Sequence, residues 1–290
     1  MDKFLVVTAD DFGLHEAVNE AVAAAARAGT LSAASLMVAA PAARDAVERA
    51  RALPQLAVGL HLTLADGWAA LSPQQIPRLI GLDGRFPDRM FLEGWRFFSS
   101  PAARRELEAE IRAQFAAFAR TGLALDHVNA HKHFHLHPTV LAILLRVARE
   151  FGSPAVRVPA EPLWFARRSS PVAAVLAAAG LAPWLALMKR RLRAAGLAHN
   201  DQVFGIAASG AMDEPTLLAI LANLPPGATE IYLHPATRSG AAIAPAMSGY
   251  RHADELAALL SPHVRAALDA TRAGRGGYRR LASLERACAA

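Results

Sequence analysis

Short apolar segments alternate with amphipathic ones along most of this chain, and this alternation limits the folds it can adopt. The apolar segments are typical of buried strands and lie at 5–11, 33–38, 57–64, 125–131, 155–158, 203–207, 230–234 and 277–282. Segments of helical period lie at 14–29, 41–53, 101–121, 138–151, 213–224 and 252–273. This order predicts an α/β fold with a parallel sheet or barrel, helices outside, and one domain over 1–290. Residues 65–100, which lie between the strand at 57–64 and the helix at 101–121, are predicted to form a long loop over one mouth of the barrel.

The first strand runs directly into two acids, Asp10 and Asp11, and then Gly13. Like charges side by side in a covered site repel each other unless a cation absorbs one of them. A strand end of an α/β fold is therefore a suitable place for a metal ligand beside a general base. The alternative is that Asp11 caps a helix beginning near Leu14, and this stretch alone does not separate the two.

Histidines are concentrated in one segment, with five of the eleven between 127 and 137. In a strand, His127, His131, His133 and His135 would share one face, which must then look into a cavity. A metal-binding or proton-transfer role is favoured for such a face, because imidazole suits both.

A further histidine, His61, lies within an otherwise apolar strand, where on its own it would read as a core residue. Beside the histidine-rich segment it becomes a third candidate ligand. Asp11, His61 and His131 then form a set of two imidazoles and one carboxylate with positions left open for water and substrate.

Composition excludes several classes of site. The single cysteine, Cys288, permits neither a disulfide framework nor a thiolate zinc site, and it fits a reducing compartment. Basic and aromatic residues are not interleaved as in nucleic-acid-binding motifs, although the formal net charge is +6. No signal-peptide pattern is visible, so a cytoplasmic location is expected.

Four motifs together resemble one known family, the YdjC-like carbohydrate deacetylases, which include chitooligosaccharide deacetylases. The motifs are Thr-Ala-Asp-Asp-Phe-Gly at 8–13, Gly-Leu-His-Leu at 59–62, Asn-Ala-His-Lys-His-Phe-His at 129–135 and Leu-His-Pro at 233–235. The resemblance implies a distorted (β/α) TIM-like barrel. It also implies that Asp11, His61 and His131 bind a divalent metal, with Asp10 as catalytic base and His234 as catalytic acid.

The chain departs from the family pattern at positions 129, 130 and 132. The family often has Asp-Ser-His-His-His where this chain has Asn129, Ala130, His131, Lys132 and His133. These changes remove no ligand, but they leave open what orients the ligands.

Within the family, the segment 156–162 and the long apolar segment after it are similar to the deacetylase associated with hopanoid biosynthesis. This resemblance implies removal of the acetyl group from an N-acetylglucosaminyl bacteriohopanepolyol. A soluble chitooligosaccharide is the alternative substrate.

Hydrolysis of an amide needs an activated water, a polarised carbonyl and a protonated leaving amine. The metal would polarise the acetyl oxygen, Asp10 would accept the proton of the water, and His234 would protonate the amine. His133, His135 and Arg157 are expected to contact the substrate. For Arg157, orienting Asp10 and forming a surface salt bridge are alternatives. Zn or Mg is the expected metal, and Mn, Co and Ni remain open.

An apolar helical insertion is predicted at about 160–199. Its residues 172–188 are nearly all apolar, and Lys189 and several arginines follow them. Interruption by Gly180 and Pro183 makes a membrane span a poor interpretation. The segment is then either a pair of core helices or a lid whose apolar face meets lipid and whose arginines meet anionic head groups.

The predicted function is deacetylation of an N-acetylated amino sugar. The candidate substrate is linked to a lipid. Peripheral contact with the inner membrane surface and formation of a homodimer are also candidate interactions. Two other functions compete. A metallophosphoesterase would need more bridging carboxylates than Asp10 and Asp11 provide. A membrane-associated lipid-binding protein could retain the metal site without turnover.

Overall fold

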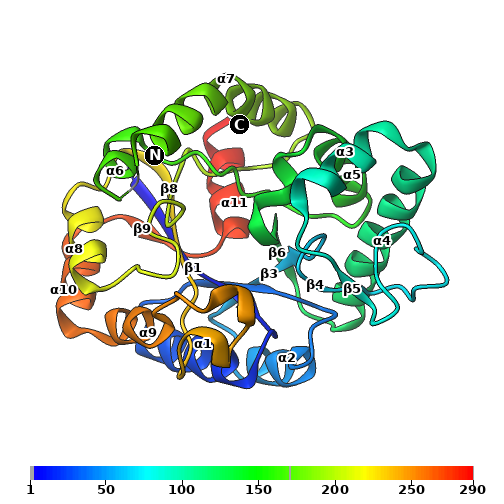
Figure 1. Ribbon diagram of the computed structural model, residues 1–290. Coiled ribbons are helices and arrows are strands. Elements are labelled where there is room, and N and C mark those ends of the chain that lie inside the picture. Colours follow the sequence, from blue (N-terminus) through cyan, green and yellow to red (C-terminus); the bar gives the residue numbers. More distant parts are fainter. Residues whose placement is uncertain (1–2, 170, 290) are drawn as a thin grey trace.

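A curled sheet of parallel strands lies at the centre of the molecule, with helices around its outer side (Figure 1). The computed structural model describes residues 3–169 and 171–289. The strands of this sheet are β1 (Lys3–Phe12), β2 (Ala33–Leu36), β3 (Ala57–Leu62), β6 (Leu125–Ala130), β7 (Gln202–Phe204), β8 (Gly227–Leu233) and β9 (Gly274–Arg275). Their order is β6-β3-β2-β1-β8-β7, and β9 pairs with β1.

The two edges of this sheet are joined only by isolated pairings. Single parallel bridges link Val128 with Val156 and Ala155 with Ala198, which continue the sheet from β6 toward β7. The described residues thus form a curled half-barrel in one domain. The predicted α/β fold is confirmed, whereas the strand pairing does not establish a full TIM barrel.

Helices cover the outside of the sheet because successive residues of a strand face opposite sides. On β1, Leu5, Val7 and Ala9 face outward into the large apolar core, while Thr8 and Asp10 face the interior. The helices are α1 (Glu16–Ala28), α2 (Ala43–Arg51), α3 (Met90–Ser99), α4 (Pro101–Arg120), α5 (Pro138–Glu150), α6 (Leu163–Ser169), α7 (Val172–Ala194), α8 (Glu214–Ala222), α9 (His252–Leu260), α10 (Pro262–Ala270) and α11 (Tyr278–Ala289), with 3₁₀ turns η1 (His131–Leu136), η2 (Gly240–Ala242) and η3 (Pro245–Met247).

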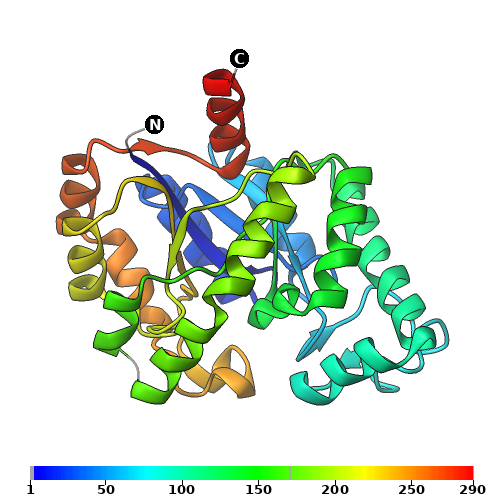
Figure 2. The same cartoon turned by 90° about the horizontal axis from the view of Figure 1, so that it is seen from above.

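The C-terminal helix α11 closes the end of the half-barrel at which the strands begin (Figure 2). Tyr278 and Leu281 pack there against Phe4 from β1 in a separate apolar cluster. The strand predicted at 277–282 is therefore wrong. The Asp126 carboxylate accepts hydrogen bonds of 2.8 Å from the first backbone N–H groups of α11 and so stabilises its first turn. Tyr278, Leu281 and Ala282 are buried at the i, i+3, i+4 spacing of a helix, whereas the capping contact comes from Asp126, 152 residues earlier.

Residues 65–100 are more ordered than the predicted loop. They contain a short antiparallel pair, β4 (Gly67–Trp68) with β5 (Arg85–Phe86), and then α3. The α3 helix buries Gly94 and Phe97, which recur at helical spacing. The prediction of a structureless loop is wrong for this part.

The apolar segment after Ala160 forms α6 and one long helix, α7, which continues through Gly180 and Pro183. The two-helix interpretation of 172–188 is thus wrong. Near the end of α7, Met188 is buried, whereas Val172 at its start is 75% exposed. Among the described residues, no helix combines the length and apolarity that a membrane crossing requires.

Candidate metal and catalytic centre

The candidate site is a cavity of about 190 Å³ at the ends of the parallel strands. Parallel strands gather their last residues at one edge, so side chains far apart in sequence meet there. The residues lining the cavity include Asp10, His61, His131, His133, Tyr232 and His234. Five of these six were predicted as site residues from the sequence.

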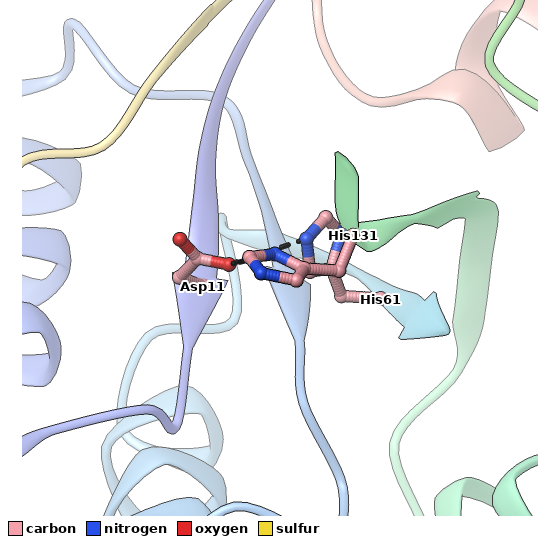
Figure 3. Close-up of side chains that lie close together, drawn as sticks. All are labelled: Asp11, His61 and His131. Atoms are coloured by element: carbon pink, nitrogen blue, oxygen red, sulfur yellow. Dashed lines mark ion pairs between the residues drawn. The ribbon is translucent and has the colours of Figure 1, made fainter. Parts of the chain in front are cut away.

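Asp11, His61 and His131 come together as one group, with three candidate ligand atoms within 4.8 Å of one another (Figure 3). Asp11 Oδ1 lies 3.2 Å from His61 Nε2 and 3.1 Å from His131 Nδ1. Both oxygens of Asp11 are buried, yet neither accepts a hydrogen bond. A buried carboxylate without donors is costly, and a divalent cation held with two imidazoles would remove that cost. The donor set fits such an ion.

The backbone at Asp11 explains how two adjacent acids reach the same cavity. Consecutive strand residues normally face opposite sides, but Asp11 has a left-handed φ of 61° and the pairing of β1 with β2 shifts register there. This bulge turns the Asp11 carboxylate toward the cavity beside Asp10. The alternative helix-capping role of Asp11 is wrong, because His15 is the N-cap of α1.

Asn129 on β6 contacts both the candidate ligand His61 and Asp10. His61 Nδ1 donates to Asn129 Oδ1 at 2.6 Å, so in the neutral imidazole the lone pair is on Nε2, which faces Asp11. The Asn129 amide also donates to Asp10 Oδ1 at 3.1 Å. An amide can accept from one neighbour and donate to the other, so the departure from the family pattern at 129 supplies the orienting contacts.

Asp10 is held by Arg157, whose Nη1 and Nη2 lie 2.5 and 3.0 Å from its two oxygens. Burial alone would raise the pKa of Asp10, but the charge and hydrogen bonds of Arg157 lower it well below its usual range. Asp10 is therefore a carboxylate with several donors, whereas its neighbour Asp11 has none.

Arg157 itself is completely buried and also pairs with Glu230 at 2.7 Å. The surface salt bridge considered for it is therefore wrong. It lies behind the wall of the cavity, and its contacts are those of a residue that orients Asp10.

The histidine run does not continue as a strand. β6 ends at Ala130, and Lys132 and His133 have left-handed φ values of 52° and 54° within η1. The predicted shared strand face is therefore wrong, since the chain turns after the candidate ligand His131. His133 still lines the cavity, 3.1 Å from the Tyr232 hydroxyl.

Two other predicted residues lie at different depths. His135 is fully buried and its Nε2 donates to the Arg157 carbonyl at 2.9 Å, so it supports the wall instead of lining the cavity. His234 follows β8 and its Nε2 lies 4.0 Å from Asp11 Oδ2. Burial lowers the pKa of His234, and the nearby acids oppose this shift.

Sequence reasoning missed Glu230 and Tyr232. Both alternate with His234 along β8, and Tyr232 contributes its ring to the cavity. The period of two was the available signal, because all three positions face the interior of the sheet.

Comparisons with known proteins show which family and fold this chain is similar to. Residues 4–270 match the family of YdjC-like proteins. Carbohydrate deacetylases from Brevibacillus brevis and Geobacillus stearothermophilus are 40% and 33% identical over 53% and 58% of this chain. These alignments cover 59% and 62% of those relatives, less than two thirds of their length. A carbohydrate deacetylase from Thermoanaerobacter pseudethanolicus is 29% identical over 81% of each chain.

One solved structure has the same fold. It is a protein from Enterococcus faecalis V583, named as a candidate cellobiose-phosphate cleavage protein. The TM-score is 0.73 at 24% identity, over 97% of this chain and 99% of the other. This likeness establishes the arrangement of the elements around the site.

Proposed function

This chain belongs to the YdjC-like protein family, and on that basis we propose that it is a metal-dependent carbohydrate deacetylase. Its substrate is an N-acetylglucosamine unit, from which it releases acetate. The observation that carries the proposal is the pair of adjacent acids. Asp11 lies between two imidazoles without a hydrogen-bond donor, and Asp10 beside it is held as an ionised base. Metal-assisted amide hydrolysis uses this combination of a cation site and a separate base.

Asp11, His61 and His131 would hold the metal, and Zn or Mg is the first candidate, with Mn, Co and Ni as further ones. When bound, such an ion polarises the acetyl carbonyl and lowers the pKa of water. The orientation of His61 by Asn129 favours this role, because it directs the free Nε2 toward Asp11.

The proton transfers are assigned to two residues of this chain. Asp10 accepts a proton from the attacking water, and its carboxylate is held in place by Arg157 and Asn129. The oxygen of that water bonds to the acetyl carbon, and the carbon–nitrogen bond breaks. His234 donates a proton to the departing nitrogen, which leaves as the amine of the sugar. His133 lines the cavity and is placed to contact the sugar.

A lipid-linked sugar, such as an N-acetylglucosaminyl hopanoid, is the proposed natural substrate. Nine of the eleven large apolar side chains exposed among the described residues belong to two segments, 82–98 and 163–176. They are Leu82, Phe91, Leu92, Trp95 and Phe98 in the first segment, and Leu163, Trp164, Val172 and Leu176 in the second.

Both segments lie on the face opposite α11, which is the side of the strand ends (Figure 2). Arginines accompany the apolar side chains, with Arg89 and Arg96 on the first segment and Arg167 on the second, all exposed. Exposed aromatic residues with a cationic rim fit the interface of an anionic bilayer. This arrangement supports peripheral membrane contact with the cavity facing the lipid surface.

The experiment that tests the function compares two substrates. Purified protein is incubated with an N-acetylglucosaminyl lipid and with chitobiose, with and without a chelator, and products are identified by mass spectrometry. We expect loss of one acetyl group from the lipid substrate, and no reaction with the chelator. Reaction of chitobiose alone would favour a soluble chitooligosaccharide substrate. No acetate from any amino sugar would contradict the proposal and favour a lipid-binding protein.

A further inference from the structure

Two chains of buried polar groups connect α11 to Asp10 through the interior of the half-barrel. This helix begins at Tyr278, beyond the residues 4–270 that match the family. We propose that Tyr278 is a positioning residue, which holds the Asp10 carboxylate in its reactive orientation through Glu230 and Arg157. The inference rests on the proposed function, in which Asp10 is the base.

The first chain begins at the Tyr278 hydroxyl, which donates to Glu230 Oε2 at 2.5 Å. Glu230 is completely buried and accepts three further hydrogen bonds: one from the Thr8 hydroxyl at 2.6 Å and two from Arg157 at 2.7 Å. Each oxygen of Glu230 thus has two donors. A carboxylate with all its acceptor positions occupied has one orientation, and Tyr278 supplies the contact from the closed end of the sheet.

Arg157 transmits this orientation to Asp10. Its guanidinium makes paired contacts with Glu230 on one edge and with Asp10 on the other. The guanidinium group is planar and rigid. If Glu230 changes its orientation and the guanidinium rotates with it, the two nitrogens that hold Asp10 must also move. The Tyr232 ring, 4.6 Å from the guanidinium carbon, covers one face of this plane.

The second chain starts at the backbone of the same helix. The N–H of Tyr278 donates to Asp126, which contacts His127 Nδ1 at 2.9 Å, and His127 Nε2 lies 3.0 Å from the Ser35 hydroxyl. The Asn129 amide contacts that hydroxyl at 2.9 Å and donates to Asp10. The Asp10 carboxylate is therefore connected to the start of α11 by hydrogen bonds through Arg157 and through Asn129.

A contribution to stability alone does not account for these two chains of buried polar groups. The apolar side of α11 already closes the sheet through Leu281 and Ala282, which pack with Phe4 and Val6. Buried ion pairs are often no more stabilising than apolar residues of the same volume. The position of Arg157 between two buried carboxylates is therefore better explained by the orientation that it gives to Asp10.

The test compares Tyr278→Phe, which keeps the ring and removes the hydroxyl, with Leu281→Ala as a control on the same helix. For Tyr278→Phe we expect kcat to fall roughly tenfold, with KM and the affinity for Co²⁺ unchanged. Leu281→Ala should lower the melting temperature at least as much but leave kcat unchanged at temperatures well below melting. Thr8→Val, which removes another donor to Glu230, should resemble Tyr278→Phe.

A readout that does not need activity is the NMR signal of the Arg157 Nε–H group, assigned with Arg157→Lys. We expect Tyr278→Phe to shift this signal and Leu281→Ala to leave it in place. The proposal would be overturned if Tyr278→Phe left both the Arg157 signal and kcat unchanged. It would also be overturned if kcat fell in both Tyr278→Phe and Leu281→Ala in proportion to the loss of melting temperature. If the wild type releases no acetate, the proposed function fails. The Arg157 signal then decides by itself whether Tyr278 holds the network.

Discussion

At the level of single residues, the adjacent acids Asp10 and Asp11 have opposite surroundings. Asp10 receives hydrogen bonds from Arg157 and Asn129, whereas both oxygens of Asp11 are buried without a donor. An acid with donors is stabilised as an anion by hydrogen bonds, whereas one with free oxygens between two imidazoles is suited to hold a cation. The two residues therefore have separable roles, although their side chains are chemically identical.

Asp10→Asn and Asp11→Asn should consequently fail in different ways. Asp10→Asn is expected to lower kcat by roughly 10²- to 10⁴-fold while metal affinity stays near the wild-type value, because only proton transfer is lost. Asp11→Asn should lose metal affinity as well as activity. Isothermal titration with Zn²⁺ and an acetate assay on both variants measure this difference. Retained activity in Asp10→Asn would show that another residue is the base.

Glu255, on α9, predicts a specific pH dependence of stability. Burial raises its pKa from 4.5 to about 7, although the backbone N–H groups of Met212 and His234 oppose the shift. Because the folded pKa is the higher one, the charged form is penalised in the folded state. The contribution of Glu255 is therefore most favourable below pH 4.5 and declines as pH rises to about 7.

Urea unfolding at pH 5 and pH 8 tests this prediction. Between these values the free energy of unfolding should fall more in the wild type than in Glu255→Gln, by on the order of 3 kcal/mol at most. The glutamine variant is the matched control, since it has the same size and no charge. Parallel pH profiles for the two proteins would show that Glu255 titrates normally.

At the level of elements, the exposed faces of α3 and of the start of α7 are the unusual feature. Helix α3 buries Phe97 yet exposes Phe91 by 88% and Trp95 by 64%. Leu176 on α7 is 67% exposed. Exposed apolar side chains that gather on one face of a protein usually mark an interaction surface, because they do not contribute to the buried core.

Trp95→Asp and Leu176→Asp should each reduce binding to vesicles of phosphatidylcholine with phosphatidylglycerol severalfold. Activity on a soluble sugar should remain, because neither side chain lines the cavity. Leu260→Asp is the control, since Leu260 is 45% exposed outside both segments. Flotation assays measure the bound fraction. Equal losses of vesicle binding and of soluble activity would point to a structural role for these side chains.

At the level of the whole molecule, the site joins strands from separate parts of the chain. Asp11 comes from β1, His61 from β3, and His131 follows β6. A ligand that contacts all three can bind only when the sheet is assembled, so its binding free energy adds to the stability of the whole domain.

Metal should therefore raise the melting temperature of the wild type and not that of Asp11→Asn. A free metal concentration 100 times the dissociation constant corresponds to about 2.7 kcal/mol of added stability. Thermal unfolding with and without a chelator measures it. A wild-type melting temperature that is independent of metal would contradict binding at this group.

The sequence by itself determined the α/β class and most of the elements, and it predicted Asp10, His61, His131, His133 and His234 among the residues that line the cavity. The period of two in the strands and of 3.6 in the helices is local, so it can be read from neighbouring residues. The candidate ligands Asp11, His61 and His131, which the structure brings together, could be selected because each follows or interrupts an apolar strand. His135 and Arg157 were also selected, but their depth behind the cavity wall could not be read from their neighbours.

Only the tertiary structure decided how those residues are used. The first turn of helix α11 donates to Asp126, the bulge at Asp11 turns its side chain beside Asp10, and Asn129 contacts both His61 and Asp10. Each of these features is a contact between strands or between a strand and a distant helix. Such contacts exist only after the sheet has curled, because folding alone brings the partners within hydrogen-bond distance.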